Sequence, residues 1–178
     1  MSSHNPLSPT QEDVLVSFTD FTLYMKTTQE LTAVEDFELM RGFFSLAGRI
    51  IEPAGGRLIK PMGDAAMIVF PAEKVDEGVK ALIRVKEEAD SYMQKRKFPC
   101  RLVVKAHFGP AALGPMGTDT WSIPDVYGQT VNSAATLVSR GMAITPQVFR
   151  KLSPQTRSLF KKHTPPVRYI PVTEKHQD

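Results

Sequence analysis

Two aspartates in this chain of 178 residues stand beside runs of apolar strand residues, where a carboxylate is chemically conspicuous. Asp64 follows Gly63 between two short apolar runs, a pattern typical of a β-hairpin. Asp20 ends an earlier strand-like run, on a face that is otherwise apolar. Carboxylate oxygens are the ligands that Mg²⁺ and Mn²⁺ prefer, so the two aspartates together could form a metal site.

The local pattern also fits a simpler interpretation. Asp64 is then only a turn residue, Lys60 an outward-facing strand position, and Asp20 a strand-terminal acid at the water boundary. A fold that brings the two carboxylates together would favour the metal site over this alternative.

The elements around the aspartates predict such a fold. In chain order they are a strand at 14–21, a helix at 31–52, hairpin strands at 57–62 and 65–70, a helix at 73–97 and a strand at 101–107. This is the βαββαβ order of ferredoxin-like folds, so we expect an α+β domain with an antiparallel sheet, helices packed on one face, and a C-terminal extension. The first strand and the hairpin are neighbours in this plan, which places Asp20 near Asp64.

The remaining segments are predicted from period and turn residues. The first helix has an apolar stripe formed by Phe37, Met40, Phe44, Ala47 and Ile51. After the last core strand we expect a short returning strand at 111–113, a loop at 118–124, a helix at 129–140, short helices within 146–162 and an edge strand at 167–172.

Length and composition limit the function classes. Residues 1–12 are expected to be a flexible lead-in, 13–173 one domain and 174–178 a tail. The formal net charge of +3, without a dense Lys/Arg run, argues against nucleic-acid binding. The single cysteine, Cys100, excludes an internal disulfide, and no apolar run is long enough for membrane insertion or ordered like a signal peptide. These features favour a cytoplasmic protein.

Four stretches resemble the class III nucleotidyl cyclase catalytic domain, the domain of adenylyl and guanylyl cyclases. FTDF at 18–21 is similar to the family's first metal strand, and KPMGD at 60–64 to its hairpin. DVYGQTVNSAAT at 125–136 resembles the motif D-x-x-G-x-x-V-N-x-A-x-R without its last residue, and HFGPAALGPMG resembles the family's glycine-rich strand pair. The order and spacing of the four match the family from residue 14 to residue 140.

The resemblance implies a two-metal site. Asp20 and Asp64 would hold two Mg²⁺ or Mn²⁺ ions, with the backbone carbonyl of Phe21 as a further ligand. In phosphoryl transfer such ions neutralise a triphosphate and activate an attacking hydroxyl.

The resemblance also implies a nucleotide site and a partner. Lys60 and Asp125 stand where the family recognises the purine, and a lysine donor with an aspartate acceptor matches adenine, so ATP is the expected substrate. Asn132 would orient the ribose. In the family these groups converge only across a head-to-tail dimer, so a homodimer is implied.

The chain departs from the family pattern in three places. The arginine that stabilises the transition state is Thr136 here, Leu23 replaces a glycine after the first metal strand, and a late phosphate-binding lysine cannot be assigned, with Lys161 and Lys162 as candidates. Arg140 is predicted to lie one turn beyond Thr136 on the same helix and to reach back toward the site. A simpler interpretation makes Arg140 an exposed cation in the last helical turn.

Two functions follow from these residues. One is a slow adenylyl cyclase that converts ATP to cyclic AMP and pyrophosphate, with Asp20, Asp64 and Arg140 as catalytic residues and Thr136 among the substrate-binding positions. The other is a catalytically inactive homologue that binds nucleotide, or only dimerises, as a regulatory module. Retention of the metal and base positions favours the cyclase.

Overall fold

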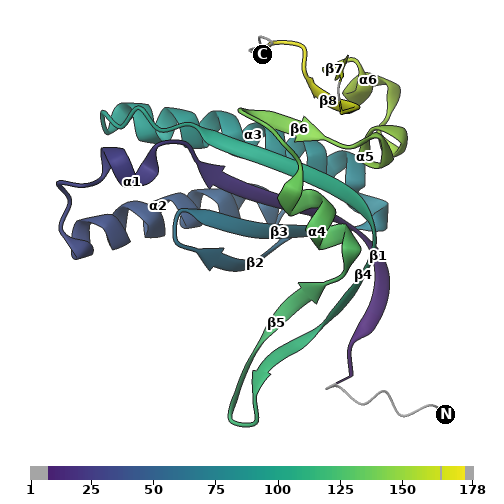
Figure 1. The fold of residues 1–178 in the computed structure, drawn as a ribbon, viewed down its shortest axis with the longest axis horizontal. Coiled ribbons are helices and arrows are strands. Elements are labelled where there is room, and N and C mark those ends of the chain that lie inside the picture. The colour runs from purple at the N-terminus through teal and green to yellow at the C-terminus, as the bar shows by residue number, and fades with distance from the viewer. Residues whose placement is uncertain (1–7, 165, 175–178) are drawn as a thin grey trace.

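The computed structural model describes residues 8–164 and 166–174 (Figure 1). Most of the predicted lead-in, and the predicted tail after residue 174, lie outside the described residues. The elements are β1 (Thr10–Phe21), α1 (Tyr24–Thr27), α2 (Ala33–Ile51), β2 (Arg57–Met62), β3 (Ala65–Pro71), the 3₁₀ helix η1 (Ala72–Lys74), α3 (Val75–Lys95), β4 (Leu102–Thr118), β5 (Trp121–Tyr127), α4 (Gln129–Thr136), β6 (Met142–Ile144), α5 (Pro146–Lys151), α6 (Pro154–Arg157), β7 (Phe160–His163) and β8 (Arg168–Pro171).

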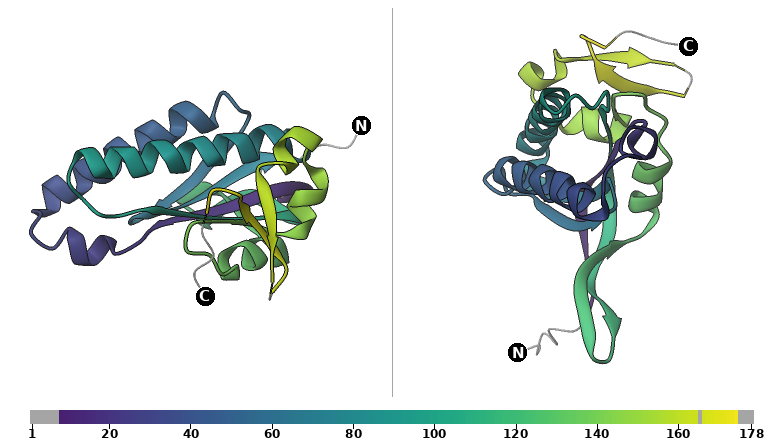
Figure 2. Two further views of the ribbon diagram at one scale, coloured as in Figure 1. Left: turned by 90° about the horizontal axis from the view of Figure 1, so that it is seen from above. Right: turned by 90° about the vertical axis from the view of Figure 1, so that its left-hand side faces the viewer.

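One sheet organises these elements, with strand order β2-β3-β1-β4-β6-β8-β7 and β5 paired to β4. All pairs are antiparallel except β4 with β6. The two long helices, α2 and α3, lie side by side on one face, and the short α4 packs on the other (Figure 2). The predicted α+β architecture with its long helices on one face is confirmed.

Helix α2 begins at a capping box. The Thr32 side chain accepts a hydrogen bond from the Glu35 backbone N–H, and the Glu35 carboxylate accepts one from the Thr32 N–H. The helix then buries Leu39, Phe43 and Ala47 against α3 and the sheet. The predicted inclusion of Phe37 in the core is wrong, since Phe37 is 66% exposed. The first turns of α2 extend past the β2–β3 hairpin, where no sheet covers them (Figure 1).

Strand boundaries differ from the prediction at both ends of the β1–β4 pair. Strand β1 begins at Thr10, so residues 10–12 belong to the sheet and not to a lead-in. Strand β4 continues to Thr118, so residues 111–113 belong to β4 and are not a separate returning strand. The chain returns as β5, which occupies most of the predicted loop at 118–124. A side chain at Gly117 would overlap the backbone of Trp121. The glycine therefore allows close approach of two strands and does not mark a turn there.

The C-terminal part also differs in detail. Helix α4 ends at Thr136 because Leu137 is extended, with φ −62° and ψ 125°, so the predicted helix at 129–140 is too long. Residues 137–141 instead carry the chain to β6, which lies beside β4. The predicted strand at 167–172 is present as β8, but it lies between β6 and β7 and is not an edge.

Candidate active site

The structure brings Asp20 and Asp64 together. Asp20 ends β1, and Asp64 follows Gly63 in the turn between β2 and β3, where Gly63 has a φ of 66° that favours glycine. Strand β1 pairs with β3 up to Thr19 opposite Ala66, which sets the hairpin turn beside the end of β1. Asp20 is exposed and Asp64 is half-buried.

The pKa of Asp64 reflects its burial and the nearby Asp20 carboxylate. Burial and the neighbouring charge of Asp20 raise the pKa of Asp64, and a hydrogen bond between the two side chains acts in the same direction. A hydrogen bond from the Phe21 backbone opposes this rise in the pKa. Two carboxylates in mutual contact repel each other when both are ionised, and a cation between them removes that repulsion.

The donor set fits a divalent metal that is shared with a phosphate. Among the described residues, no group of three or more His, Cys, Asp or Glu is placed to hold a metal, so the protein offers two carboxylates and backbone oxygens here. Mg²⁺ is commonly bound by one or two carboxylates, with waters and substrate phosphates completing its octahedron. The pair therefore suits a cation whose remaining ligands are waters and phosphate oxygens.

The turn after Asp20 has a left-handed backbone conformation at Leu23, a conformation that favours glycine. Leu23 has φ 58° and ψ 16°, the left-handed conformation, and directly precedes α1. Its side chain is 61% exposed, so no packing holds it in place. A non-glycine residue in this conformation costs about 1–2 kcal/mol. Replacement of the family glycine thus preserves the path of the chain beside the carboxylates, at a cost in stability.

Lys60 and Asp125 form an ion pair between β2 and β5. The Lys60 Nζ lies 2.6 Å from Asp125 Oδ2, and the Asp125 side chain is only 4% exposed. Asp125 Oδ1 accepts a hydrogen bond of 2.8 Å from the Val126 backbone N–H. The register of β2 against β3 shifts between Leu58 and Lys60, an irregularity of the kind that re-aims a side chain.

A cavity of about 440 Å³ adjoins this ion pair. Asp125 lines it together with polar residues and with apolar side chains from three strands: Ile59, Leu113, Ile123 and Val126. The charged side chains of Glu12 and Arg57 also line the cavity, and its volume lies in the range of small-molecule pockets. Of the two residues predicted to recognise the base, Asp125 lines the cavity and Lys60 reaches it only through its ion pair with Asp125.

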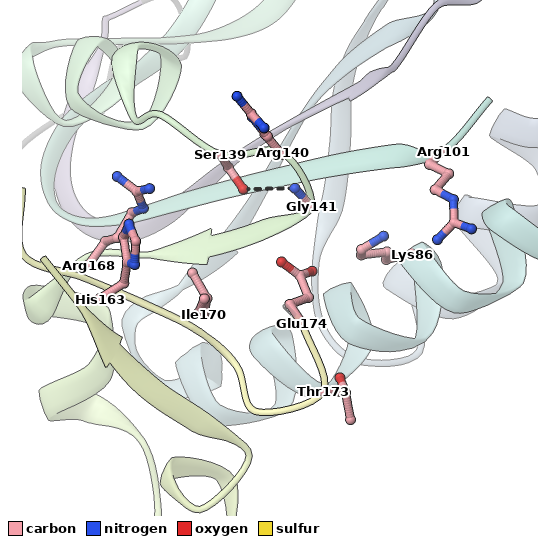
Figure 3. Close-up of a pocket in the computed structure, with 10 residues that line it drawn as sticks. All are labelled: Lys86, Arg101, Ser139, Arg140, Gly141, His163, Arg168, Ile170, Thr173 and Glu174. Carbon is pink, nitrogen blue, oxygen red and sulfur yellow. Dashed lines mark hydrogen bonds between the residues drawn. The ribbon is translucent and has the colours of Figure 1, made fainter. Parts of the chain in front are cut away.

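The predicted residues on and after α4 are placed differently. Asn132 and Thr136 are both exposed on α4, and the Thr136 hydroxyl donates to the Asn132 carbonyl oxygen at 2.8 Å. The predicted helical position of Arg140 is wrong, because α4 ends before it. Arg140 instead lines a different cavity, near Arg168 and Glu174 (Figure 3). Arg140 is therefore not on the helix and does not reach back along it over Thr136.

Lys161, a candidate for the late phosphate-binding lysine, forms hydrogen bonds elsewhere in the structure. Lys161 Nζ donates to the backbone oxygens of Val172 and Glu174, which ties it to the C-terminal segment. The cavity that Arg140 lines also contains Arg101 and Arg168, which the sequence did not single out because no motif joins positions so far apart in the chain.

No helix within the described residues has the length and apolarity needed to cross a membrane.

Comparison with known proteins identifies the family. Residues 7–166 match the model of the adenylate and guanylate cyclase catalytic domain, and the chain belongs to this family. An adenylate cyclase of Anabaena cylindrica is 24% identical over 159 residues, which cover 81% of this chain and 32% of the relative.

Solved structures show the same fold. A bacterial light-regulated adenylyl cyclase superposes with a TM-score of 0.82 at 23% identity, covering 98% of this chain and 56% of that one. The adenylyl cyclase CyaB from P. aeruginosa gives 0.79 at 17% identity, covering 97% and 99%, and the guanylyl cyclase Cya2 gives 0.76 at 13% identity, covering 92% of each chain. The chain thus spans about a third of the Anabaena relative and about half of the light-regulated cyclase.

Proposed function

We propose that this domain is an adenylyl cyclase that converts ATP to cyclic AMP and pyrophosphate. The observation that carries the proposal is the proximity of the Asp20 carboxylate, at the end of β1, to the Asp64 carboxylate, in the β2–β3 turn. In this reaction the ribose 3′-hydroxyl attacks the α-phosphorus and pyrophosphate leaves. The site accordingly has to gather negative charge and hold one hydroxyl in line with the bond that breaks.

Each residue has a defined task in this proposal. Asp20 and Asp64 would hold two Mg²⁺ or Mn²⁺ ions, with the Phe21 carbonyl as a further ligand. The ions supply charge neutralisation and a more acidic hydroxyl. Lys60 donates to a purine ring nitrogen and Asp125 accepts from the adenine amino group. Their mutual 2.6 Å ion pair keeps both groups paired before a base arrives.

Base choice follows from hydrogen-bond polarity. Guanine presents a carbonyl acceptor and a ring N–H where adenine presents an amino donor and a bare ring nitrogen. If the wrong base is bound, a buried polar group of the site is left without a hydrogen-bond partner, which strongly disfavours that base. Lys60→Glu combined with Asp125→Cys should weaken ATP use, and a parent protein that prefers GTP would overturn this assignment.

We further propose that the active unit is a head-to-tail homodimer in the cytoplasm, with metals from one chain and base recognition from the other. Asn132 on α4 is exposed and would orient the ribose of the nucleotide bound to the partner's metals. The β4–β5 arm projects from the sheet (Figure 1) and exposes Met116 and Trp121. Exposed apolar side chains on a projecting arm are typical of an interface.

Complementation between variants tests the activity and the dimer together. Asp20→Asn removes a metal-binding carboxylate and Asp125→Ala removes the acceptor for the adenine amino group, so each should abolish cyclic AMP formation with Mn²⁺. A mixture of the two should recover about a quarter of the parental activity, because statistical pairing leaves one intact site in half of the dimers. Asp20→Asn mixed with Asp64→Asn is the matched control and should recover none. A parent with activity whose mixtures never recover would contradict the shared site.

One observation favours the alternative of an inactive regulatory homologue. Thr136 stands in place of the family arginine, and its hydroxyl is used within α4. By analogy with other phosphoryl-transfer arginines, the loss can lower the rate by about 10³–10⁵. Thr136→Arg should therefore raise turnover. Saturable ATP binding without cyclic AMP, in the parent and in Thr136→Arg alike, would support the regulatory function.

A further inference from the structure

A tyrosine just after the end of β1 joins α1 to α2. Tyr24 is the first residue of α1, four positions after Asp20, and it is buried. Its hydroxyl donates a hydrogen bond to Oδ1 of Asp36, which lies in the first turn of α2. Neither Tyr24 nor Asp36 has a task in the reaction proposed above.

The hydrogen bond matters to both of its partners. Within the part of the chain that the structure describes, it is the one hydrogen bond that the Asp36 carboxylate forms. Hydrogen bonds to a charged acceptor are stronger than those between neutral groups. Burial, and after it the hydrogen bond and the charge of Asp36, raise the pKa of Tyr24 above its usual value. The hydroxyl therefore stays protonated, and remains a donor, at neutral pH.

Tyr24 also lies close to the acidic pair. After burial and Asp36, the charge of Asp64 contributes to the raised pKa of Tyr24. The Tyr24 ring lies 6.2 Å, between centroids, from the ring of Phe21, the residue whose carbonyl is proposed as a metal ligand. Phe21 in turn packs edge-on against Phe43 of α2, with the centroids 4.8 Å apart. Tyr24 and Phe21 therefore attach the end of β1 to the same helix.

The turn between β1 and Tyr24 needs such an attachment. Leu23 holds a left-handed backbone there, and its exposed side chain does not pack to keep it in place. Backbone of this kind persists only where the surrounding contacts hold it on both sides. Before Leu23, the Thr22 N–H donates to the Arg101 carbonyl oxygen at 2.9 Å. After Leu23, the hydrogen bond from Tyr24 to Asp36 ties α1 to α2.

We propose that Tyr24 is a positioning residue for the metal site, because its hydrogen bond to Asp36 holds the turn after β1 in place. This role rests on the function proposed above, since it requires that the acidic pair binds a divalent cation. Binding groups have to be held within about 0.5 Å of their productive geometry. A looser turn would move Asp20 and the Phe21 carbonyl relative to Asp64 and so weaken metal binding.

Binding of Mn²⁺ alone to the full chain, without nucleotide, tests this role. The Kd is measured from the enhancement of water proton relaxation by bound Mn²⁺. Asp64→Asn removes a proposed ligand and should abolish saturable binding. Tyr24→Phe should weaken binding about three- to tenfold, the range that corresponds to one hydrogen bond. Because Tyr24→Phe leaves every charge in place, a weaker affinity reports the position of the ligands.

Two substitutions at Asp36 separate the hydrogen bond from the charge. Asp36→Asn keeps a side-chain oxygen that can accept from the tyrosine hydroxyl, whereas Asp36→Ala removes it. Both substitutions remove the same negative charge. Asp36→Asn should therefore bind Mn²⁺ about threefold or more tightly than Asp36→Ala does.

Tyr92→Phe is the matched control for loss of a tyrosine hydroxyl. The Tyr92 hydroxyl donates to the Leu39 backbone oxygen at 2.9 Å, so this tyrosine joins α3, and not α1, to α2. Urea unfolding should show that Tyr24→Phe and Tyr92→Phe both lose stability. The Mn²⁺ affinity should fall in Tyr24→Phe and stay at the parental value in Tyr92→Phe.

The outcomes separate the role of Tyr24 from the function on which it rests. A parent without saturable Mn²⁺ binding, or binding that survives in Asp64→Asn, would overturn the metal site and the role of Tyr24 together. Parental affinity in Tyr24→Phe, beside loss of binding in Asp64→Asn, would overturn the role of Tyr24 and leave the metal site standing. Equal loss of affinity in Tyr92→Phe, or equal affinities in the two Asp36 variants, would overturn that role as well.

Discussion

Removing one partner of the Lys60–Asp125 ion pair should destabilise the fold, and the cost should depend on how deeply the remaining charge is buried. Lys60→Met removes the ammonium and leaves the nearly buried Asp125 carboxylate with only the Val126 N–H. Breaking a fully buried pair costs about 3–5 kcal/mol, but the Lys60 side chain is 30% exposed and water can enter, so we expect about 2 kcal/mol. Asp125→Asn keeps the shape and frees a lysine that can reach solvent, which should cost about 1 kcal/mol.

A double-mutant cycle measures the interaction itself. The free energy of unfolding is determined by urea denaturation, followed by circular dichroism, for the parent, the two single variants and the double variant. The double variant should lose about 1 kcal/mol less than the sum of the singles. Arg84→Met, which breaks an exposed pair on α3, is the control and should cost no more than about 0.5 kcal/mol. Strict additivity of the Lys60 and Asp125 variants, within about 0.3 kcal/mol, would refute the view that the pair is an energetic unit.

Three further changes have expected outcomes that stability measurements check. Leu23→Gly relieves the left-handed backbone strain and should raise the free energy of unfolding by about 0.5–1 kcal/mol; a lower value would contradict the observed φ of 58°. Burial alone would raise the pKa of Asp76, but hydrogen bonds from Lys80 and Ser153 outweigh it and lower the pKa to about 2, below the unfolded value. The free energy of unfolding of the parent should therefore fall by about 1–2 kcal/mol as the pH falls from about 4 to 2, and that of Asp76→Asn should not. If the two proteins lose stability in parallel as the pH falls, Asp76 does not contribute to the acid sensitivity. Gly56→Ala would place its methyl group against the ring of the buried Phe70 and should cost about 1–3 kcal/mol in urea unfolding, whereas an unchanged midpoint would mean that the ring moves aside freely.

The elements that carry the acidic pair could be predicted because their signals are local. The hairpin around Gly63 and Asp64 has strand residues on both sides of a glycine turn, and β2 and β3 form there as expected. The end of β1 at Phe21 was likewise visible from alternation. The proximity of Asp20 and Asp64 required the strand order as well, which the βαββαβ plan supplied.

The misplaced segments share a physical cause. The glycines at 109–117 have the composition of turns, yet all lie within β4, where Gly117 lets the backbone of β5 approach closely, which only the three-dimensional pairing reveals. The helical spacing through Arg140 is a real sequence pattern, but the need to reach β6 ends α4 at Thr136. Tertiary pairing overrode local preference in both cases.

The cavity in Figure 3 was beyond prediction for a different reason. Its cations come from α3, from Arg101 just before β4, from the α4–β6 segment and from β8, between positions 86 and 168 of the chain. Of these, the sequence singles out Arg140 alone, and for a different site. Only the packing of the C-terminal strands beside β6 brings them to one place.

The backbone contact between Arg101 and Thr22 joins the two regions of the domain. The Thr22 N–H donates to the Arg101 carbonyl at 2.9 Å, and the Arg101 N–H donates to the Thr22 hydroxyl at 3.0 Å, directly after the Asp20–Phe21 end of β1. Binding free energies at two linked sites are reciprocal. A ligand that alters the backbone at Arg101 and thereby changes metal affinity at Asp20 by some factor would have its own affinity changed by the metal by that same factor. The Mn²⁺ affinity of Thr22→Ala, compared with that of the parent, would measure how far this contact supports the Asp20 end of β1.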